Sequence, residues 1–197
     1  MSPQTFIFMG RSGCGKGTQA DLLMKALKEK DPNGEIMYIE TGASFREFIK
    51  GDKYSNQLSK KVYLADERQP DFLAIYMWGQ ALLNDFKGTE HLFFDGVARS
   101  LAEAMAITTA MDFYNRKVTV IFLNVSREWS ETRLLARGRF DDKSKEEIDR
   151  RLNWFDRDSA PALGYVKVNQ IYNVMQVDGE RTIEEIHKDI VSQIKWE

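Results

Sequence analysis

Ten residues near the amino terminus carry the strongest chemical signal in the sequence. Residues 10–19 read GRSGCGKGTQ and lie between the apolar run 6–9 and the amphipathic segment 20–30. Glycines let successive backbone N–H groups point into one concavity, a helix start adds partial positive charge, and Lys16 supplies a mobile cation. The loop therefore predicts a polyphosphate site. The residues expected to contact the polyphosphate are Gly13, Cys14, Gly15, Lys16, Gly17 and Thr18.

The loop departs by one position from the general phosphate-loop pattern. That pattern places Ser or Thr directly after the lysine, whereas here Gly17 intervenes and Thr18 follows. The alternative is a glycine-rich turn whose lysine merely faces solvent. This alternative is disfavoured because an apolar run and a helical segment flank the loop, as the motif requires.

Further candidates for phosphate binding lie downstream. Two segments each combine a glycine with an arginine just after an apolar run, and their polar and glycine residues are Thr41, Gly42, Arg46, Asp95, Gly96 and Arg99. A basic group follows, with Arg133, Arg137, Arg139 and Arg151. Guanidinium groups bind phosphate oxygens in a forked geometry. The alternative for the basic group is a solvated charged face, paired with acids such as Asp141, Asp142, Glu146 and Glu147.

The chain alternates apolar, β-rich runs with helical stretches. The runs cover residues 5–9, 35–39, 91–94, 118–124 and 171–177. This alternation predicts an α/β fold, and residues 118–124 are apolar on both faces, as in a central strand of a parallel sheet. We expect a three-layer sandwich, with a five-stranded parallel sheet and helices on both faces. Ligands bind such sheets at the carboxyl ends of the strands, where the candidate residues fall.

Composition and charge exclude several classes of protein. A length of 197 residues favours one domain. A net charge of -2, with both signs mixed, offers no broad basic face for nucleic acid or an anionic membrane. No apolar run suits a signal peptide or a membrane helix, and the single cysteine excludes an internal disulfide. We expect a cytoplasmic monomer without an obligate protein partner.

Residues 15–19, Gly-Lys-Gly-Thr-Gln, resemble the adenylate kinase family of nucleoside monophosphate kinases. In that family a Thr-Gly-Asp turn with an arginine follows the second strand, and Asp-Gly-Phe-Pro-Arg follows the third. Residues 41–46 and 95–99 are similar to these segments. The resemblance spans nearly the whole chain. It implies a P-loop NTP hydrolase-like fold and reversible transfer of the ATP γ-phosphoryl group to AMP, giving two ADP, with Mg²⁺ as the cofactor.

The resemblance also implies roles for the matching residues. Residues in catalytic positions are Lys16, Arg99, Arg137, Arg139 and Arg151. ATP binding is expected to extend beyond the loop to Arg133, Arg137 and Gly179, with the first of these stacking on the adenine. The monophosphate is expected to contact Thr41, Gly42, Arg46, Gly96, Arg99, Glu103, Arg139 and Arg151. Magnesium is expected near Thr18 and Asp95, the latter acting through water.

The same resemblance divides the single kinase domain into a core and two insertions. The core is expected to comprise residues 1–40, 71–136 and 143–197. Residues 41–70 match the acceptor-binding insertion. Residues 137–142 match a short lid, because only Gly138 separates the two arginines there.

Four positions depart from the family pattern and leave the function open. Ala43 replaces the aspartate of the first turn, Val97 and Ala98 replace the Phe-Pro pair, and Glu103 stands where adenylate kinases have an adenine-reading glutamine. An ionised glutamate only accepts hydrogen bonds, so a kinase for GMP, CMP, UMP or a deoxy monophosphate is one alternative. A nucleotide-binding protein without turnover is another. Glu103 could also face solvent, or lie one helical turn out of register.

Overall fold

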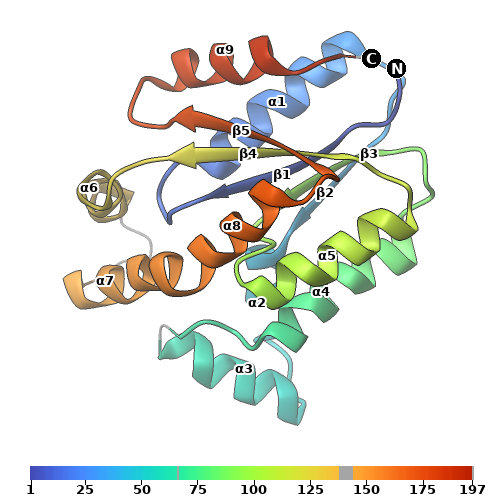
Figure 1. Cartoon of the computed structure of the whole chain (residues 1–197). Coiled ribbons are helices and arrows are strands. Elements are labelled where there is room, and N and C mark those ends of the chain that lie inside the picture. Colours follow the sequence, from blue (N-terminus) through green and yellow to red (C-terminus); the bar gives the residue numbers. More distant parts are fainter. Residues whose placement is uncertain (66, 138–143, 197) are drawn as a thin grey trace.

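The computed structural model describes residues 1–65, 67–137 and 144–196. Its strands form one parallel sheet in the order β2-β3-β1-β4-β5 (Figure 1). The strands are β1 (Thr5–Gly10), β2 (Ile36–Glu40), β3 (His91–Asp95), β4 (Val118–Asn124) and β5 (Tyr172–Asp178). The predicted α/β fold with five parallel strands is confirmed, and each predicted strand end lies within one residue of the observed one.

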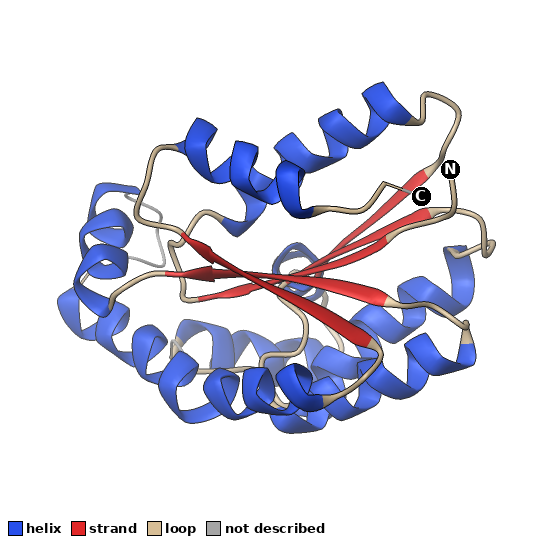
Figure 2. Cartoon of the chain, turned by 45° about the horizontal axis from the view of Figure 1, so that its top comes forward, coloured by secondary structure: helices blue, strands red, loops and turns tan. Residues whose placement is uncertain are grey.

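Helices cover both faces of the sheet and give three layers (Figure 2). One face carries α1 (Lys16–Lys30) and α9 (Ile183–Gln193), which pack against each other. The other face carries α4 (Asp71–Asp85), α5 (Leu101–Phe113) and α8 (Ala160–Val168). The predicted three-layer sandwich is therefore confirmed.

The central strand β1 shows why an uninterrupted apolar run belongs in such a sheet. Successive strand residues point to opposite faces. Phe6 and Phe8 accordingly join one core together with Leu23 of α1, while Ile7 joins the other core together with Ile107 of α5. Each of these side chains is almost fully buried, which stabilises the fold by about 1.5–3 kcal/mol per side chain.

The remaining helices lie beyond the carboxyl edge of the sheet. α2 (Thr41–Phe48) follows β2, and α3 (Tyr54–Leu64) projects away from the sheet in Figure 1. α6 (Arg127–Arg137) follows β4, and α7 (Lys145–Trp154) runs through a wide π-helical turn (Phe155–Ser159) into α8. The division into core and insertions stays a prediction, and residues 138–142 of the expected lid lie outside the described residues.

The carboxyl ends of three neighbouring strands bring the candidate segments together. Glu40, the last residue of β2, pairs in register with Asp95, the last residue of β3. Asp95 in turn pairs with Phe8, two residues before β1 ends at Gly10. The segments that follow these strands therefore lie side by side. Among the helices of the described chain, none has the length and apolar character to cross a membrane.

Candidate active site

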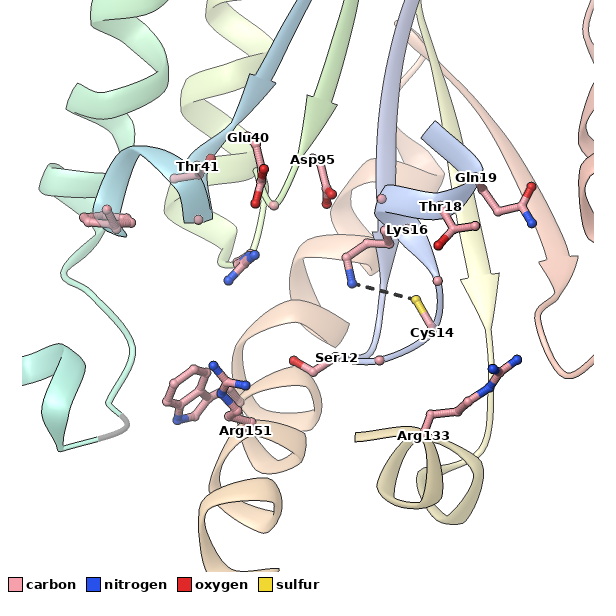
Figure 3. Close-up of a pocket in the computed structure, with 18 of the residues that line it drawn as sticks. Ser12, Cys14, Lys16, Thr18, Gln19, Glu40, Thr41, Asp95, Arg133 and Arg151 are labelled. Atoms are coloured by element: carbon pink, nitrogen blue, oxygen red, sulfur yellow. Dashed lines mark hydrogen bonds between the residues drawn. The ribbon is translucent and has the colours of Figure 1, made fainter. Parts of the chain in front are cut away.

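The glycine-rich loop joins the end of β1 to the start of α1. Gly13 and Gly15 have φ angles of 82° and 95°, which residues with side chains rarely adopt. Lys16, the first residue of α1, donates hydrogen bonds from Nζ to the carbonyl oxygens of Gly10 and Arg11, each at 3.0 Å. An ammonium group and a helix amino end therefore lie together (Figure 3), an arrangement that attracts phosphate.

Cys14 contributes packing to this loop rather than reactivity. Its side chain is buried, and its Sγ lies 3.7 Å from Lys16 Nζ (Figure 3). Burial raises the pKa of the Cys14 thiol, although the charge of Lys16 opposes this effect. The protonated thiol is the unreactive form, so a contribution of Cys14 to ATP binding would come from its backbone.

Asp95 ends β3 and faces the start of α1. A Cβ added to Gly17 would lie 3.5 Å from Asp95 Oδ2, an ordinary van der Waals distance, so the carboxylate lies directly beside the loop. Tyr38 of β2 donates its hydroxyl to the same oxygen at 3.2 Å. Burial and the charge of Asp95 raise the pKa of Tyr38, which keeps the hydroxyl protonated. The hydrogen bond thus fixes the carboxylate next to the loop.

Arg46 of α2 is oriented by the last residue of β2. Its Nη2 lies 2.7 Å from Glu40 Oε1. A Cβ added to Gly42 would lie 3.3 Å from Arg46 Nη1, so the glycine permits the guanidinium to approach the backbone. The Arg46 side chain keeps 41% of its surface exposed, which leaves it accessible to an anion.

Arg99 packs directly against Gly96 in the loop after β3. A Cβ at Gly96 would lie 2.5 Å from Arg99 Nη2, and the φ of Gly96 is +81°. The left-handed backbone favours glycine, and a side chain at this position would displace the Arg99 guanidinium. Within the described residues, the Arg99 guanidinium has no hydrogen-bonded or ion-paired acid. A fork of N–H donors is therefore available for a phosphate oxygen.

The loop that carries Arg99 has a backbone that a Phe-Pro pair could not adopt. Ala98 has a φ of +54°, whereas proline is locked near about −65°. Glu103 accepts a hydrogen bond from the backbone N of Arg99 at 2.6 Å, and Ser100, the residue before α5, accepts one from the backbone N of Glu103 at 3.2 Å. The replacement of proline therefore changes the turn, and Glu103 stabilises the new one.

Glu103 lies in the cavity wall and not in solvent. Its side chain is only 1% exposed, and it lines the same cavity as Arg99 and Arg68. Burial raises the pKa of the Glu103 carboxyl, although the backbone hydrogen bond from Arg99 opposes this effect. Protonation is therefore favoured relative to an exposed glutamate.

Arg133 of α6 and Arg151 of α7 approach the loop from two separate helices (Figure 3). The guanidinium carbon of Arg133 lies 4.6 Å from the centre of the Trp129 ring. A cation stacked on an indole ring forms a flat surface suited to a nucleobase. Gly179 is absent from the described cavity lining, because it follows β5 and packs against Val125.

Two predicted arginines cannot be assigned to the site. Arg139 lies outside the described residues, together with the two aspartates expected in the lid. Arg137 is the last residue of α6, and its expected contact with ATP stays a prediction.

Apart from Gly179, the other predicted residues converge on one cavity of about 800 Å³. Known ligand sites measure about 300–1,000 Å³, so this cavity is large enough for an extended ligand. The predicted residues that line it are Gly13, Cys14, Gly15, Lys16, Gly17, Thr18, Thr41, Gly42, Arg46, Asp95, Gly96, Arg99, Glu103, Arg133 and Arg151.

Sequence reasoning missed several residues of the same wall. They include Tyr38, Glu40, Glu67, Arg68, Gln69, Trp129 and Trp154. Glu40 ends β2 at the edge where ligands bind, and Tyr38 lies two residues before it, so the rule for strand ends could have found Glu40. Arg68 offered no comparable signal, because its partners are Asp71 and Asp158, the second of which is 90 positions away.

Two buried polar atoms of the wall lack a partner among the described residues. They are Oγ1 of Thr41 and Oε1 of Gln19. Gln19 uses its other polar atom, Nε2, to donate to the backbone oxygen of Ile183 at 3.0 Å. Unpaired buried polar atoms are rare in proteins, so both atoms are candidates to bind a ligand.

The loop can hold the polyphosphate of one nucleotide, and Arg46 and Arg99 offer cations to a second anion in the same cavity. Phosphoryl transfer needs such an arrangement, because the protein mainly aligns two substrates and neutralises charge. Fold and site together define a P-loop phosphotransferase.

Comparison with known proteins gives the family. Residues 8–171 match the adenylate kinase family model. An adenylate kinase of Flavobacterium psychrophilum is 33% identical over 187 residues, covering 92% of this chain and 93% of that protein. An adenylate kinase of Flavobacterium johnsoniae is 32% identical over 197 residues, with 95% and 96% covered. One from Prochlorococcus marinus is 28% identical over 185 residues, with 93% and 94% covered. The chain belongs to the adenylate kinase family and is an ATP-dependent phosphotransferase.

Proposed function

We propose that the protein transfers the γ-phosphoryl group of ATP to AMP reversibly and forms two ADP. One observation supports this proposal: the same cavity is lined by Lys16 of the loop, by Arg46 of α2 and by Arg99 from the loop after β3. The relatives above are named adenylate kinases, which supports AMP as the acceptor.

The roles of the residues follow from charge and position. Lys16 and the loop amides hold the β- and γ-phosphates of ATP, and Arg46 and Arg99 hold the phosphate of AMP. An oxygen of the AMP phosphate attacks the γ-phosphorus, the bond from phosphorus to the bridging oxygen breaks, and ADP leaves. A phosphate monoester is largely dianionic at neutral pH, so no general base is required. Charge on the migrating group is neutralised by Arg137, Arg139 and Arg151.

Magnesium fits the residues beside the loop. Mg²⁺ retains several waters and is bound by one or two carboxylates together with substrate phosphates. Thr18 and Asp95 line the cavity beside the loop and would hold the ion, Asp95 through water. When bound, Mg²⁺ neutralises charge on the phosphates. The described residues include no group of three or more His, Cys, Asp and Glu suited to a metal, so phosphates and waters would complete the coordination.

The glutamate at position 103 is compatible with adenine as the acceptor base. An amide both donates and accepts hydrogen bonds, and a protonated carboxyl does the same. Burial raises the pKa of Glu103, so protonation, which would give the carboxyl a donor as glutamine has, costs less than in an exposed glutamate. The unpaired Oγ1 of Thr41 in the same wall adds a further group for the acceptor nucleotide.

The proposal needs only one chain and two nucleotides. Apart from Arg137 and Gly179, the described residues assigned to either substrate line the same cavity, so we propose that the protein acts as a monomer. Cytoplasmic location stays a prediction from the sequence.

The test is an assay of ADP formation from ATP with AMP, GMP, CMP, UMP or dTMP as acceptor. We expect the highest kcat/KM with AMP. A higher value with another monophosphate would replace AMP as the acceptor, and binding of ATP without ADP formation from any acceptor would contradict the proposed transfer.

A further inference from the structure

The wide π-helical turn Phe155–Ser159 joins α7 to α8 and contacts three different parts of the site. Its position has a physical cause, because Pro161 follows within the first turn of α8. Proline has no N–H, and its ring would clash with the carbonyl four residues earlier in a regular helix. Wide turns of this kind relieve such conflicts and recur at functional sites.

Asp156 reaches the phosphate loop. Its Oδ1 lies 2.7 Å from Nη1 of Arg11, the residue after the first loop glycine, and this contact is an ion pair without aligned hydrogen-bond geometry. Its Oδ2 accepts from Nη1 of Arg127 at 3.3 Å. The Arg11 guanidinium also lies 4.6 Å from the ring centre of Phe155, and Phe155 stacks on Phe122 of β4. The loop is thus fixed to the turn by charge and by an aromatic ring.

Asp158 points to the acceptor side of the cavity. Residues two positions apart on a helix do not share a face, so Asp158 diverges from Asp156. Its Oδ2 accepts from Nε of Arg68 at 3.1 Å, and Arg68 Nη1 donates to Asp71 at 2.6 Å. The Asp158 side chain is 16% exposed, and a hydrogen bond from Arg157 lowers its pKa, with Arg68 adding to the effect. The second carboxylate of the turn thus holds an arginine of the cavity wall.

Ser159 holds the backbone of the acceptor-phosphate arginine. Its hydroxyl donates to the carbonyl oxygen of Arg99 at 3.0 Å, next to Ala98 with its left-handed φ of +54°. A smaller pocket of about 50 Å³ lies between the turn and the loop, and Phe155 and Ser159 form part of its wall. The cationic residues that line it are Lys16, Arg68, Arg99 and Arg151. The turn therefore borders the place where the cations from both halves of the site meet.

We propose that the turn Phe155–Ser159 is a positioning element that sets the phosphate loop and the acceptor arginines relative to each other. Asp156 acts on the donor side through Arg11, and Asp158 acts on the acceptor side through Arg68. The kinetic prediction rests on the proposed function, because it links Asp156 to the binding of ATP and Asp158 to the binding of AMP. Neither carboxylate needs to touch a substrate.

The test measures KM for each nucleotide, at saturating concentration of the other, in Asp156→Asn and Asp158→Asn. Asp156→Asn is expected to raise KM for ATP about three- to tenfold with KM for AMP unchanged, since coupled contacts of this kind change binding by that order. Asp158→Asn is expected to show the reverse pattern. Asp156→Glu keeps the charge and is expected to restore KM for ATP.

The chain supplies matched controls. Asp149→Asn removes the other acid on Arg127, and Lys87→Gln removes an exposed ion pair with Glu35 away from the cavity. Both controls are expected to leave the two KM values unchanged. The double variant Arg11→Gln with Asp156→Asn is expected to have no higher KM for ATP than the worse single variant, because both changes break one contact.

Equal changes in both KM values, additive effects of Arg11 and Asp156, or the same effect in the controls would overturn the inference. If Asp156→Asn does not fold, KM for ATP in Arg11→Gln alone tests the same contact. Dissociation constants of ATP and AMP, measured separately, repeat the comparison without turnover. If the parent protein forms no ADP, the proposed function is contradicted. The positioning role is then tested by the dissociation constants of ATP and AMP alone.

Discussion

The donor and acceptor halves of the cavity are built in different ways. In the donor half, Lys16 is held by carbonyl oxygens of its own loop, at Gly10 and Arg11. In the acceptor half, side-chain carboxylates orient the arginines: Glu40 pairs with Arg46, and Asp158 pairs with Arg68 from 90 positions away. Backbone carbonyls thus hold the lysine of the donor half, whereas side-chain carboxylates hold two arginines of the acceptor half.

The difference teaches where sequence variation is tolerated. A loop made by backbone N–H groups depends on a few glycines and one lysine, so its sequence stays close to a motif. An acceptor pocket made by pairs of side chains can change several residues together, provided that the cations keep their places. The departures at Ala43, Val97, Ala98 and Glu103 all lie in the acceptor half.

The largest expected effect comes from the donor half. Lys16→Met is expected to reduce kcat for ADP formation by at least about a hundredfold, as loss of one preorganised charge at a transition state does, while the melting temperature changes little. Lys25→Met, at an exposed position of the same helix, is the control and should keep full activity. Unchanged turnover in Lys16→Met would remove the lysine from the mechanism.

In the acceptor half, Gly96→Ala is expected to raise KM for AMP about tenfold with KM for ATP unchanged, because weakening one charged hydrogen bond costs about 1.4 kcal/mol or more. The added Cβ would lie 2.5 Å from Arg99 Nη2 and displace the guanidinium. Gly88→Ala is the matched control, since Gly88 has a φ of +98° and nothing within 4 Å of an added Cβ. Equal changes in KM for AMP in both variants would show that backbone strain, and not Arg99, causes the effect.

Glu103→Gln tests the buried carboxyl through the pH dependence of stability. Because burial raises the pKa of Glu103 above its ordinary value of 4.5, the folded protein favours the protonated form. The contribution of the protonated carboxyl to the free energy of unfolding is fully present below the pKa of the unfolded state. It is lost as pH rises through the pKa of the folded state. The variant is therefore expected to match the parent near about pH 4 and to melt about 2–4 °C higher at neutral pH. A difference in melting temperature that is constant with pH would contradict this account.

The smallest effect is expected at the turn that replaces Phe-Pro. Ala98→Gly should raise the free energy of unfolding by about 0.5–1 kcal/mol, because a left-handed residue with a Cβ costs about 1–2 kcal/mol and glycine returns part of that as chain entropy. Asn115, with a φ of 51°, provides the comparison. Asparagine tolerates this conformation, so Asn115→Gly should gain less in a denaturant titration. An equal or larger gain at Asn115 would argue against strain at Ala98.

The sequence predicted the features that depend on local backbone geometry and missed those that depend on contacts between distant side chains. The strands and the loop were predictable, because an apolar run such as residues 118–124 and the glycine pattern report local backbone requirements. Arg46 and Arg99 were found through their places after strands. The pairs Arg11–Asp156 and Arg68–Asp158 could not be found, since each joins residues that only the fold brings together. The left-handed Ala98 was equally hidden, because alanine carries no signal for that conformation.

The central claim is that one cavity holds two nucleotides and passes a phosphoryl group directly between them. ATP labelled at the γ-phosphorus, incubated with AMP and Mg²⁺, tests it most directly. The account predicts that the label appears in ADP, with one labelled ADP formed for each AMP consumed, and that Lys16→Met prevents this transfer. Release of the label as inorganic phosphate, at a rate unaffected by AMP, would contradict direct transfer.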